Sequence, residues 1–242
     1  FMLQRCLTPA DRVWLYVHGK GGCKEEAADF AALACPRGWQ VLAADLPEHG
    51  ARRGDGVPLD PWHAAPELRA LLGYAKGRWQ HTALRCTSLG AWFSLLAFQD
   101  RPLDRALFVS PVLDMERLIQ EMMSWAGVTE SRLEAEGEIS TEFGETLSWP
   151  YLQYVRAHPV SRWETPTRIL WAQKDHLVPR DTVDRFARRF RCSRRWRRGR
   201  QYRPGTLRRR EGRGHRDRDR HRGDPRRERQ ARGHDDILPR QG

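Results

Sequence analysis

The residue whose setting first suggests chemistry is Ser88, which follows the short apolar run 82–86 and precedes a helix-like segment. A sharp turn from a strand into a helix lifts a serine hydroxyl out of the end of a sheet, where it can act as a nucleophile. Small residues must flank such a serine. Gly90 meets this need, whereas Cys86 stands where the usual pattern has a first glycine. A serine that only caps the helix is the alternative interpretation.

A glycine-rich stretch, 18–22 (HGKGG), comes directly after an earlier strand-like run. Consecutive glycines let backbone N–H groups point into a cleft, and the oxyanion that develops in acyl transfer needs two such donors. The N–H of Lys20 and that of Leu89, directly after the serine, would supply them. An ordinary glycine turn beside a structural His18 is the alternative.

A third stretch, 44–50 (ADLPEHG), follows the next strand-like run. Together the three stretches resemble a bacterial member of the α/β-hydrolase family, which commonly has an HG motif, a D-x-P-x-H-G loop and a nucleophile elbow after successive strands. The resemblance covers 12–190. It implies an α/β fold with a mostly parallel sheet, helices on both faces and a serine, an acid and a histidine on loops at the carboxyl ends of the strands.

The same resemblance implies an acid after the penultimate strand, and Asp175 matches that position. Its role would be to accept the Nδ1 proton of the histidine and to steady the imidazolium that forms. A plain turn residue before Pro179 is the other interpretation. Asp114 is a rival acid position, although it also suits the N-cap of a helix over 115–125.

Alternating strand-like and helix-like segments would position these residues. Apolar runs predict strands, and periodic segments predict helices between them, which is the βαβ rhythm of a parallel sheet. The stretch from about 112 to 163 breaks this rhythm and suits a helical cap insertion. The predicted strands are 13–18, 39–44, 82–86, 106–110 and 167–172, and the predicted core helices are 24–35, 61–76, 88–98 and 181–190.

The general base of the triad is missing from this pattern. The family places its histidine after one more strand, but the sequence after Cys192 shows no strand-like run. Neither the histidines of the arginine-rich segment nor those of the body are good candidates; these are His215, His221 and His234 in the former and His18, His49, His81, His158 and His176 in the latter.

Composition divides the chain into a body, 1–192, and a C-terminal segment, 193–242. The segment holds 19 arginines against 7 acidic residues, which equals the net charge of +12 of the whole chain. The body is therefore neutral, and no nucleic-acid partner is expected for it. The segment lacks periodicity, and disorder is predicted for these roughly 50 residues. A frameshift near Cys192 in GC-rich coding sequence would produce such a change.

Other classes of protein find little support in the composition. The five cysteines are scattered, so neither a disulfide framework nor a metal site is expected, and a cytoplasmic location fits them best. The most apolar stretch, 83–98, is too short and too interrupted by polar residues to span a membrane. No cofactor is expected.

The leading hypothesis is a serine hydrolase that cleaves a carboxylic ester, thioester or amide of a small molecule through an acyl-enzyme on Ser88. Without its histidine this chain would turn over poorly. One alternative is an inactive protein of the same fold that binds a ligand or partner. Another is nucleic-acid binding through the basic segment. The sequence selects neither the substrate nor the oligomeric state.

Overall fold

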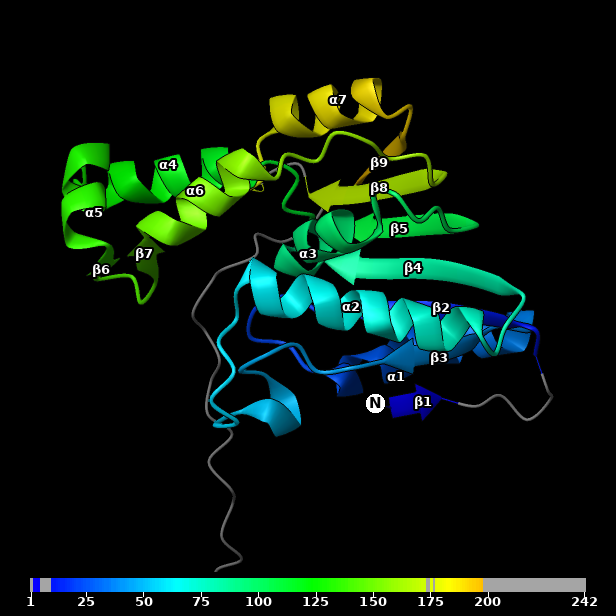
Figure 1. Cartoon of the computed structure of the whole chain (residues 1–242). Coiled ribbons are helices and arrows are strands. Elements are labelled where there is room, and N and C mark those ends of the chain that lie inside the picture. The colour runs from blue at the N-terminus through cyan, green and yellow to red at the C-terminus, as the bar shows by residue number, and fades with distance from the viewer. Residues whose placement is uncertain (1, 5–9, 173–174, 176, 198–242) are drawn as a thin grey trace, which may run out of the picture. The chain divides into compact units, whose positions relative to one another are not determined.

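A computed structural model describes residues 2–4, 10–172, 175 and 177–197 of the chain. Its main sheet contains β1 (Met2–Gln4), β2 (Arg12–Val17), β3 (Gln40–Ala43), β4 (His81–Thr87), β5 (Arg105–Val109), β8 (Thr167–Ala172) and β9 (Ser193–Arg197). The strand order is β1-β3-β2-β4-β5-β8-β9, and only β1 is antiparallel to its neighbour (Figure 1). The prediction of a mostly parallel sheet is therefore confirmed.

Helices cover both faces of this sheet. The helix α1 (Ala27–Ala34) packs with alternate residues of β2 and β3 in one apolar cluster. On the other face, α2 (Pro61–Lys76), α3 (Leu89–Phe98) and α7 (Arg180–Arg189) contribute to the larger apolar core. All four helices lie within two residues of the predicted bounds except α1, whose ends are single turns of 3-10 helix.

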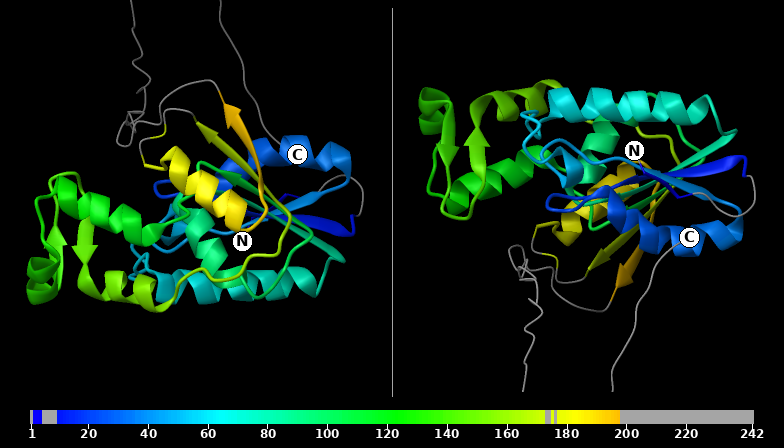
Figure 2. Two further views of the ribbon diagram at one scale, coloured as in Figure 1. Left: turned by 90° about the horizontal axis from the view of Figure 1, so that it is seen from above. Right: turned by 90° about the horizontal axis from the view of Figure 1, so that it is seen from below.

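An insertion between β5 and β8 forms the predicted cap. It contains α4 (Met115–Trp125), α5 (Glu130–Glu136), the hairpin strands β6 (Glu138–Ser140) and β7 (Thr146–Ser148), and α6 (Trp149–Ala157). Figures 1 and 2 show it beyond the edge of the sheet to which the arrowheads of β4 and β8 point. The hairpin was not predicted because strands of three residues are too short to show an alternating pattern.

The sequence analysis was wrong about the residues directly after Cys192. Residues 193–197 form β9, which pairs in parallel with β8 from Arg168↔Ser193 to Ala172↔Arg197. Backbone hydrogen bonds, which do not depend on apolar side chains, hold this strand, and Arg194 pairs with Asp184 of α7 at 2.6 Å. The disorder predicted for these five residues is not found. Residues 198–242, to which the rest of that prediction applies, lie outside the described residues.

Close packing of α3 against the end of β2 is the tightest contact around Ser88. A Cβ atom on Gly90 would lie 2.2 Å from the carbonyl oxygen of His18, and this oxygen belongs to the backbone. A Cβ atom on Gly19 would lie 3.1 Å from the Cβ of Ser88. These two glycines allow the strand end, the loop and the helix to meet.

We predict opposite effects for two glycine-to-alanine substitutions. Gly90→Ala should lower the free energy of unfolding by about 2 kcal/mol or more, because backbone atoms must move apart. Gly73→Ala, in α2, has open space around the new methyl group. It should raise stability by about 0.5–1 kcal/mol, because alanine favours the helix. Urea denaturation of both variants measures the two changes, and equal effects would contradict the packing described.

Candidate active site

Ser88 occupies the turn between β4 and α3 in a backbone conformation that side chains rarely adopt, with φ 48° and ψ −123°. Three hydrogen bonds hold the turn: its N–H donates to the carbonyl of Val109 at 3.1 Å, and its carbonyl accepts from the N–H groups of Ala91 and Val112, each at 3.0 Å. The residue is half-buried, and its hydroxyl bonds to none of the described residues. Its oxygen is therefore presented at the carboxyl end of the central strand.

Cys86 takes the position of the first glycine in the serine motif. Its side chain is fully buried in the main core, and burial raises the pKa of the thiol well above its usual value. A protonated, buried thiol is chemically inert. Cys86 is therefore a packing residue, and Ser88 is the nucleophile candidate at this turn.

Two histidines fix the glycine-rich loop next to the serine. The Nε2 atom of His18 accepts the N–H of Leu46 at 3.0 Å, and that of His49 accepts the N–H of Gly21 at 2.8 Å. Each Nε2 atom must therefore lack a proton, so each Nδ1–H donates to a carbonyl, that of Gly19 for His18 and that of Pro47 for His49. Both rings have two partners, and neither is free to act as a general base.

Asp45 anchors the loop that carries His49. Its carboxylate accepts the N–H of Lys24 at 2.8 Å, the ammonium of the same residue at 2.5 Å and the N–H of Ala51 at 3.0 Å. Burial alone would raise the pKa of Asp45, but these hydrogen bonds outweigh it and the pKa lies below its usual value. A Cβ atom on Gly50 would lie 2.2 Å from this carboxylate, which explains the glycine at the end of the motif.

The two proposed oxyanion donors belong to segments that meet at the serine. Lys20 follows Gly19, which packs against Ser88, and its N–H has no backbone partner among the described residues. Leu89 is the first residue of α3, where backbone N–H groups have no partner within a helix. The Lys20 side chain forms an ion pair with Glu145 of the cap hairpin.

Asp175 lies in the loop after β8 and organises that loop. Its Oδ1 atom accepts the N–H groups of Leu177 and Val178 at 3.1 and 3.2 Å. Only β5 separates β8 from β4, so the strand ends that carry Asp175 and Ser88 are about 10 Å apart across the sheet. The rival Asp114 caps α4 through the N–H of Arg117 and pairs with Arg185, so its carboxylate is engaged in structure.

No described histidine is hydrogen-bonded to Ser88 or Asp175. His81 pairs with Asp104 at the start of β4, at the edge of the sheet opposite the serine, and His158 bonds to the backbone at the end of α6. The sequence analysis did not consider His63, whose Nδ1 lies 2.7 Å from Asp60 at the first turn of α2. Asp60 is the N-cap of α2 and His63 is the third residue of the helix, and this spacing could have indicated the pair. The other candidates, His176, His215, His221 and His234, lie outside the described residues.

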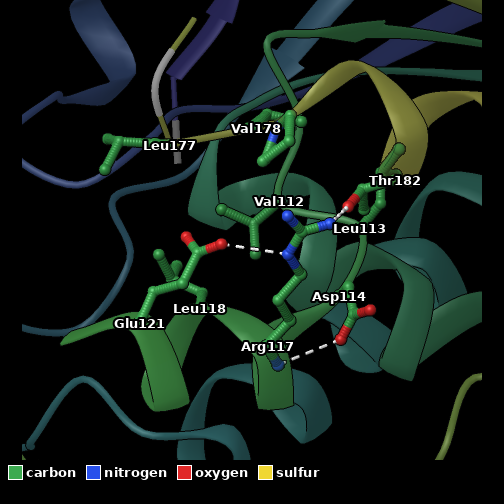
Figure 3. A pocket seen from close by; sticks show the side chains of 10 residues that line it. Val112, Leu113, Asp114, Arg117, Leu118, Glu121, Leu177, Val178 and Thr182 are labelled. Carbon is green, nitrogen blue, oxygen red and sulfur yellow. Dashed lines mark hydrogen bonds and ion pairs between the residues drawn. The ribbon is translucent and has the colours of Figure 1, made fainter. Parts of the chain in front are cut away.

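A small pocket opens between the loops after β5 and β8 and the cap helix α4 (Figure 3). Its empty space of about 230 Å³ includes open solvent, so the part that the protein encloses is much smaller. Val112, whose N–H binds the Ser88 carbonyl, forms one wall, and Leu177 and Val178, whose N–H groups bind Asp175, form another. Arg117 lies on the polar side, where Glu121 and Asp181 neutralise it. The pocket thus lies between the loop after β5, which is bonded to the turn of Ser88, and the loop of Asp175.

Two further features concern cofactors and membranes. Among the described residues, no group of three or more His, Cys, Asp or Glu side chains could hold a metal ion. Within the same part of the chain, no helix combines the length and apolar character needed to cross a bilayer.

Comparison with solved structures assigns the chain its fold. No family model matches the sequence, and no curated protein matches it either. Among solved structures, Est1E from Butyrivibrio proteoclasticus with bound ferulic acid is 19% identical, with a TM-score of 0.63, over 81% of this chain and 83% of that chain. The mouse alpha/beta hydrolase domain-containing protein 10 is 17% identical, with a TM-score of 0.62, over 81% and 83%. The type II thioesterase BorB from the borrelidin biosynthetic cluster is 18% identical, with a TM-score of 0.51, over 80% and 86%.

We predict that the buried imidazole of His18 makes the fold sensitive to acid. Burial lowers its pKa below the ordinary value of 6.5, so the unfolded chain binds more protons than the folded chain below that pH. The free energy of unfolding should therefore fall as the pH drops below about 6.5. In His18→Asn this part of the pH dependence should disappear, whereas His81→Asn, on the surface, should keep it. Urea denaturation between pH 5 and 8 tests this, and an unchanged slope in His18→Asn would contradict it.

Proposed function

We propose, from the premise that the chain has the α/β-hydrolase fold, that it is a serine hydrolase of small carboxylic esters, thioesters or amides. The Ser88 oxygen attacks the carbonyl carbon, and its proton passes to a base. The N–H groups of Lys20 and Leu89 stabilise the negative charge on the former carbonyl oxygen. The alcohol, thiol or amine then leaves, and water hydrolyses the acyl-enzyme.

One observation carries this proposal, namely the strained backbone of Ser88. A residue other than glycine at φ 48° and ψ −123° costs free energy, on the order of 1–3 kcal/mol, and persists only where the surroundings hold it there. A helix cap would not require this conformation, because helix caps have ordinary extended backbones, as Asp60 and Thr129 do here. The strain is explained if the turn must present the hydroxyl to a substrate.

The chemistry of similar structures supports the choice of reaction. Est1E was solved with ferulic acid, a carboxylic acid, and BorB is named a thioesterase. The acid bound to the first protein and the thioester that the name of the second implies both contain an acyl carbon. A nucleophilic serine with two nearby N–H donors suits attack on such a carbon whether its leaving atom is oxygen, sulfur or nitrogen. We further propose that the substrate is a small acyl compound and that the protein is cytoplasmic.

The proposed acid, Asp175, is among the described residues, whereas the general base is not identified among them. Asp175 is proposed to orient a histidine, and its Oδ2 atom has no partner among the described residues. No described histidine is hydrogen-bonded to Ser88, so impaired turnover is part of the proposal. Triads without one member retain only about 10³- to 10⁴-fold acceleration over water. The alternative of an inactive protein that binds ligands through the same pocket rests on this same observation. The alternative of nucleic-acid binding concerns residues that lie almost wholly outside the described part.

The pocket beside Val112 is proposed to receive the acyl group. Its apolar wall consists of Val112, Leu118, Leu177 and Val178, and its charged side chains are paired with each other or with neighbours. An uncharged, apolar acyl group fits this lining better than a carboxylate does, because no cation in the lining is left without a counter-charge. The small volume favours a short chain.

We predict that a fluorophosphonate probe labels the protein at Ser88. The probe reacts with activated serines, so Ser88→Ala should abolish labelling. Ser110 provides a matched control, because it also follows a strand, β5, and also has a positive φ, 42°. Ser110→Ala should be labelled like the wild type. Gel fluorescence measures the result, and labelling that survives in Ser88→Ala would disprove the nucleophile assignment.

We predict that narrowing the pocket shifts the preference for acyl chain length. Leu118→Phe places a larger side chain in the apolar wall. The ratio of kcat/KM for p-nitrophenyl octanoate to that for the acetate should fall by roughly tenfold or more. Leu33→Phe, at a residue of α1 that is 62% exposed, should leave the ratio unchanged. If both variants keep the wild-type ratio, the acyl group binds elsewhere.

A further inference from the structure

Tyr151 projects from the cap onto the helix that begins at Ser88. It lies in α6, and its ring stacks on that of Trp92 with the centroids 5.7 Å apart and an angle of 25° between the planes. Trp92 is four residues after Ser88, which places it one helical turn further along the same face of α3. The ring of Trp62, at the start of α2, approaches Tyr151 from another side at 6.2 Å. Two aromatic side chains, those of Trp92 and Trp62, thus hold the tyrosine beside the helix that begins after Ser88.

The hydroxyl of Tyr151 forms no hydrogen bond with the described residues. Burial raises the pKa of this group far above its usual value, and the negative charges of Asp60 and Glu145 raise it further. The hydroxyl therefore stays protonated and can donate. Tyr151 is only partly buried, and its hydroxyl is not among the fully buried atoms without a partner. The hydroxyl therefore reaches solvent and is free to bond to a ligand that displaces water.

The hydroxyl and the acyl pocket lie on opposite sides of Ser88. The pocket is formed by loops that follow β5 and β8. The groups around the hydroxyl belong to the other half of the sheet, because Asp60 precedes α2 and Glu145 pairs with Lys20 directly after β2. In the strand order β3-β2-β4-β5-β8, the strand that ends at Ser88 stands between these two halves. A substrate attacked at Ser88 with its acyl group in the pocket would extend its other half toward Tyr151.

We propose that the Tyr151 hydroxyl donates a hydrogen bond to an uncharged oxygen in the leaving-group half of the substrate, that is, in its alcohol or thiol part. The inference rests on the proposed function, because it needs an acyl group bound at Ser88. The carboxylates of Asp60 and Glu145 disfavour an anionic group in this place, since like charges repel; Asp60 is paired with the imidazole of His63, and Glu145 with Lys20. Tyr151 thus selects alcohols or thiols that carry a neutral acceptor.

The test uses the full chain and three esters of nearly equal size. 2-Methoxyethyl butyrate carries an extra oxygen in its alcohol half, butyl methoxyacetate carries it in its acyl half, and butyl butyrate has none. Tyr151→Phe removes the hydroxyl and keeps the ring that stacks on Trp92. Tyr154→Phe, one turn further along α6, is the matched control. Acid release gives kcat/KM for each ester, and thermal unfolding and fluorophosphonate labelling of Ser88 are measured for each variant.

The expected result is a fall of about tenfold in kcat/KM of Tyr151→Phe for 2-methoxyethyl butyrate alone, with unchanged melting temperature and labelling. Tyr154→Phe should match the wild type throughout. Equal losses for all three esters, no loss for any, or a loss confined to butyl methoxyacetate would overturn the inference while labelling of Ser88 leaves the proposed function intact. If the wild type is not labelled at Ser88, the proposed function fails and this inference fails with it.

Discussion

The whole site depends on the contact between the first turn of α3 and the end of β2. The helix can begin directly after Ser88 only because Gly90 has no side chain to meet the His18 carbonyl, which would lie 2.2 Å from a Cβ atom. This contact brings the strand that ends in the nucleophile candidate against the strand that leads into the oxyanion loop. Ser88 adopts its positive φ at this same turn. The strained residue and the juxtaposed strand ends therefore belong to one contact.

Hydrogen bonds around the turn offset this strain. The backbone of Ser88 is bonded to Val109 and to Val112, and each such bond contributes about 1 kcal/mol. The adjacent loop is held in the same way by side chains, with His18 and His49 each using both ring nitrogens. Imidazoles near a catalytic serine invite assignment as bases. Here the hydrogen bonds of both rings show that they support the loop.

Periodic, apolar segments allowed most of the fold to be predicted from the sequence. The predicted bounds of α2, α4 and β8 agree with the structure. Pro61 starts α2, Asp114 caps α4, and an apolar run fills β8, which has a neighbouring strand on each side. A strand that forms mainly through backbone pairing was missed. The strand β9 has the sequence Ser-Arg-Arg-Trp-Arg. It pairs with β8 on one side, and no described strand pairs with its other side. Edge strands are often charged, because charge prevents pairing with other molecules.

The roles of individual polar residues were harder to predict than the elements that carry them. The sequence places Ser88, Lys20 and Asp175 after strands of a parallel sheet, and this is enough to bring them to one edge. The sequence does not reveal the groups with which these residues form hydrogen bonds or ion pairs. Asp175 binds its own loop through Oδ1, and the Glu145 that pairs with Lys20 is 125 residues away in the sequence. Such pairings depend on how the cap folds back, which no local pattern encodes.

The pairing of Lys20 with Glu145 also links two parts of the site that have different tasks. The backbone of Lys20 belongs to the proposed oxyanion loop, while its side chain contacts the cap hairpin. Both side chains are substantially exposed, at 50% and 36%, and exposed ion pairs contribute only about 0–1 kcal/mol. The cap also contacts α2 and α3 through the rings of Tyr151, Trp62 and Trp92, and aromatic pairs contribute about 0.5–1.5 kcal/mol beyond their burial. The stacked rings and the buried apolar side chains of the cap therefore fix its position, and the ion pair adds a salt-sensitive contact to the proposed oxyanion loop.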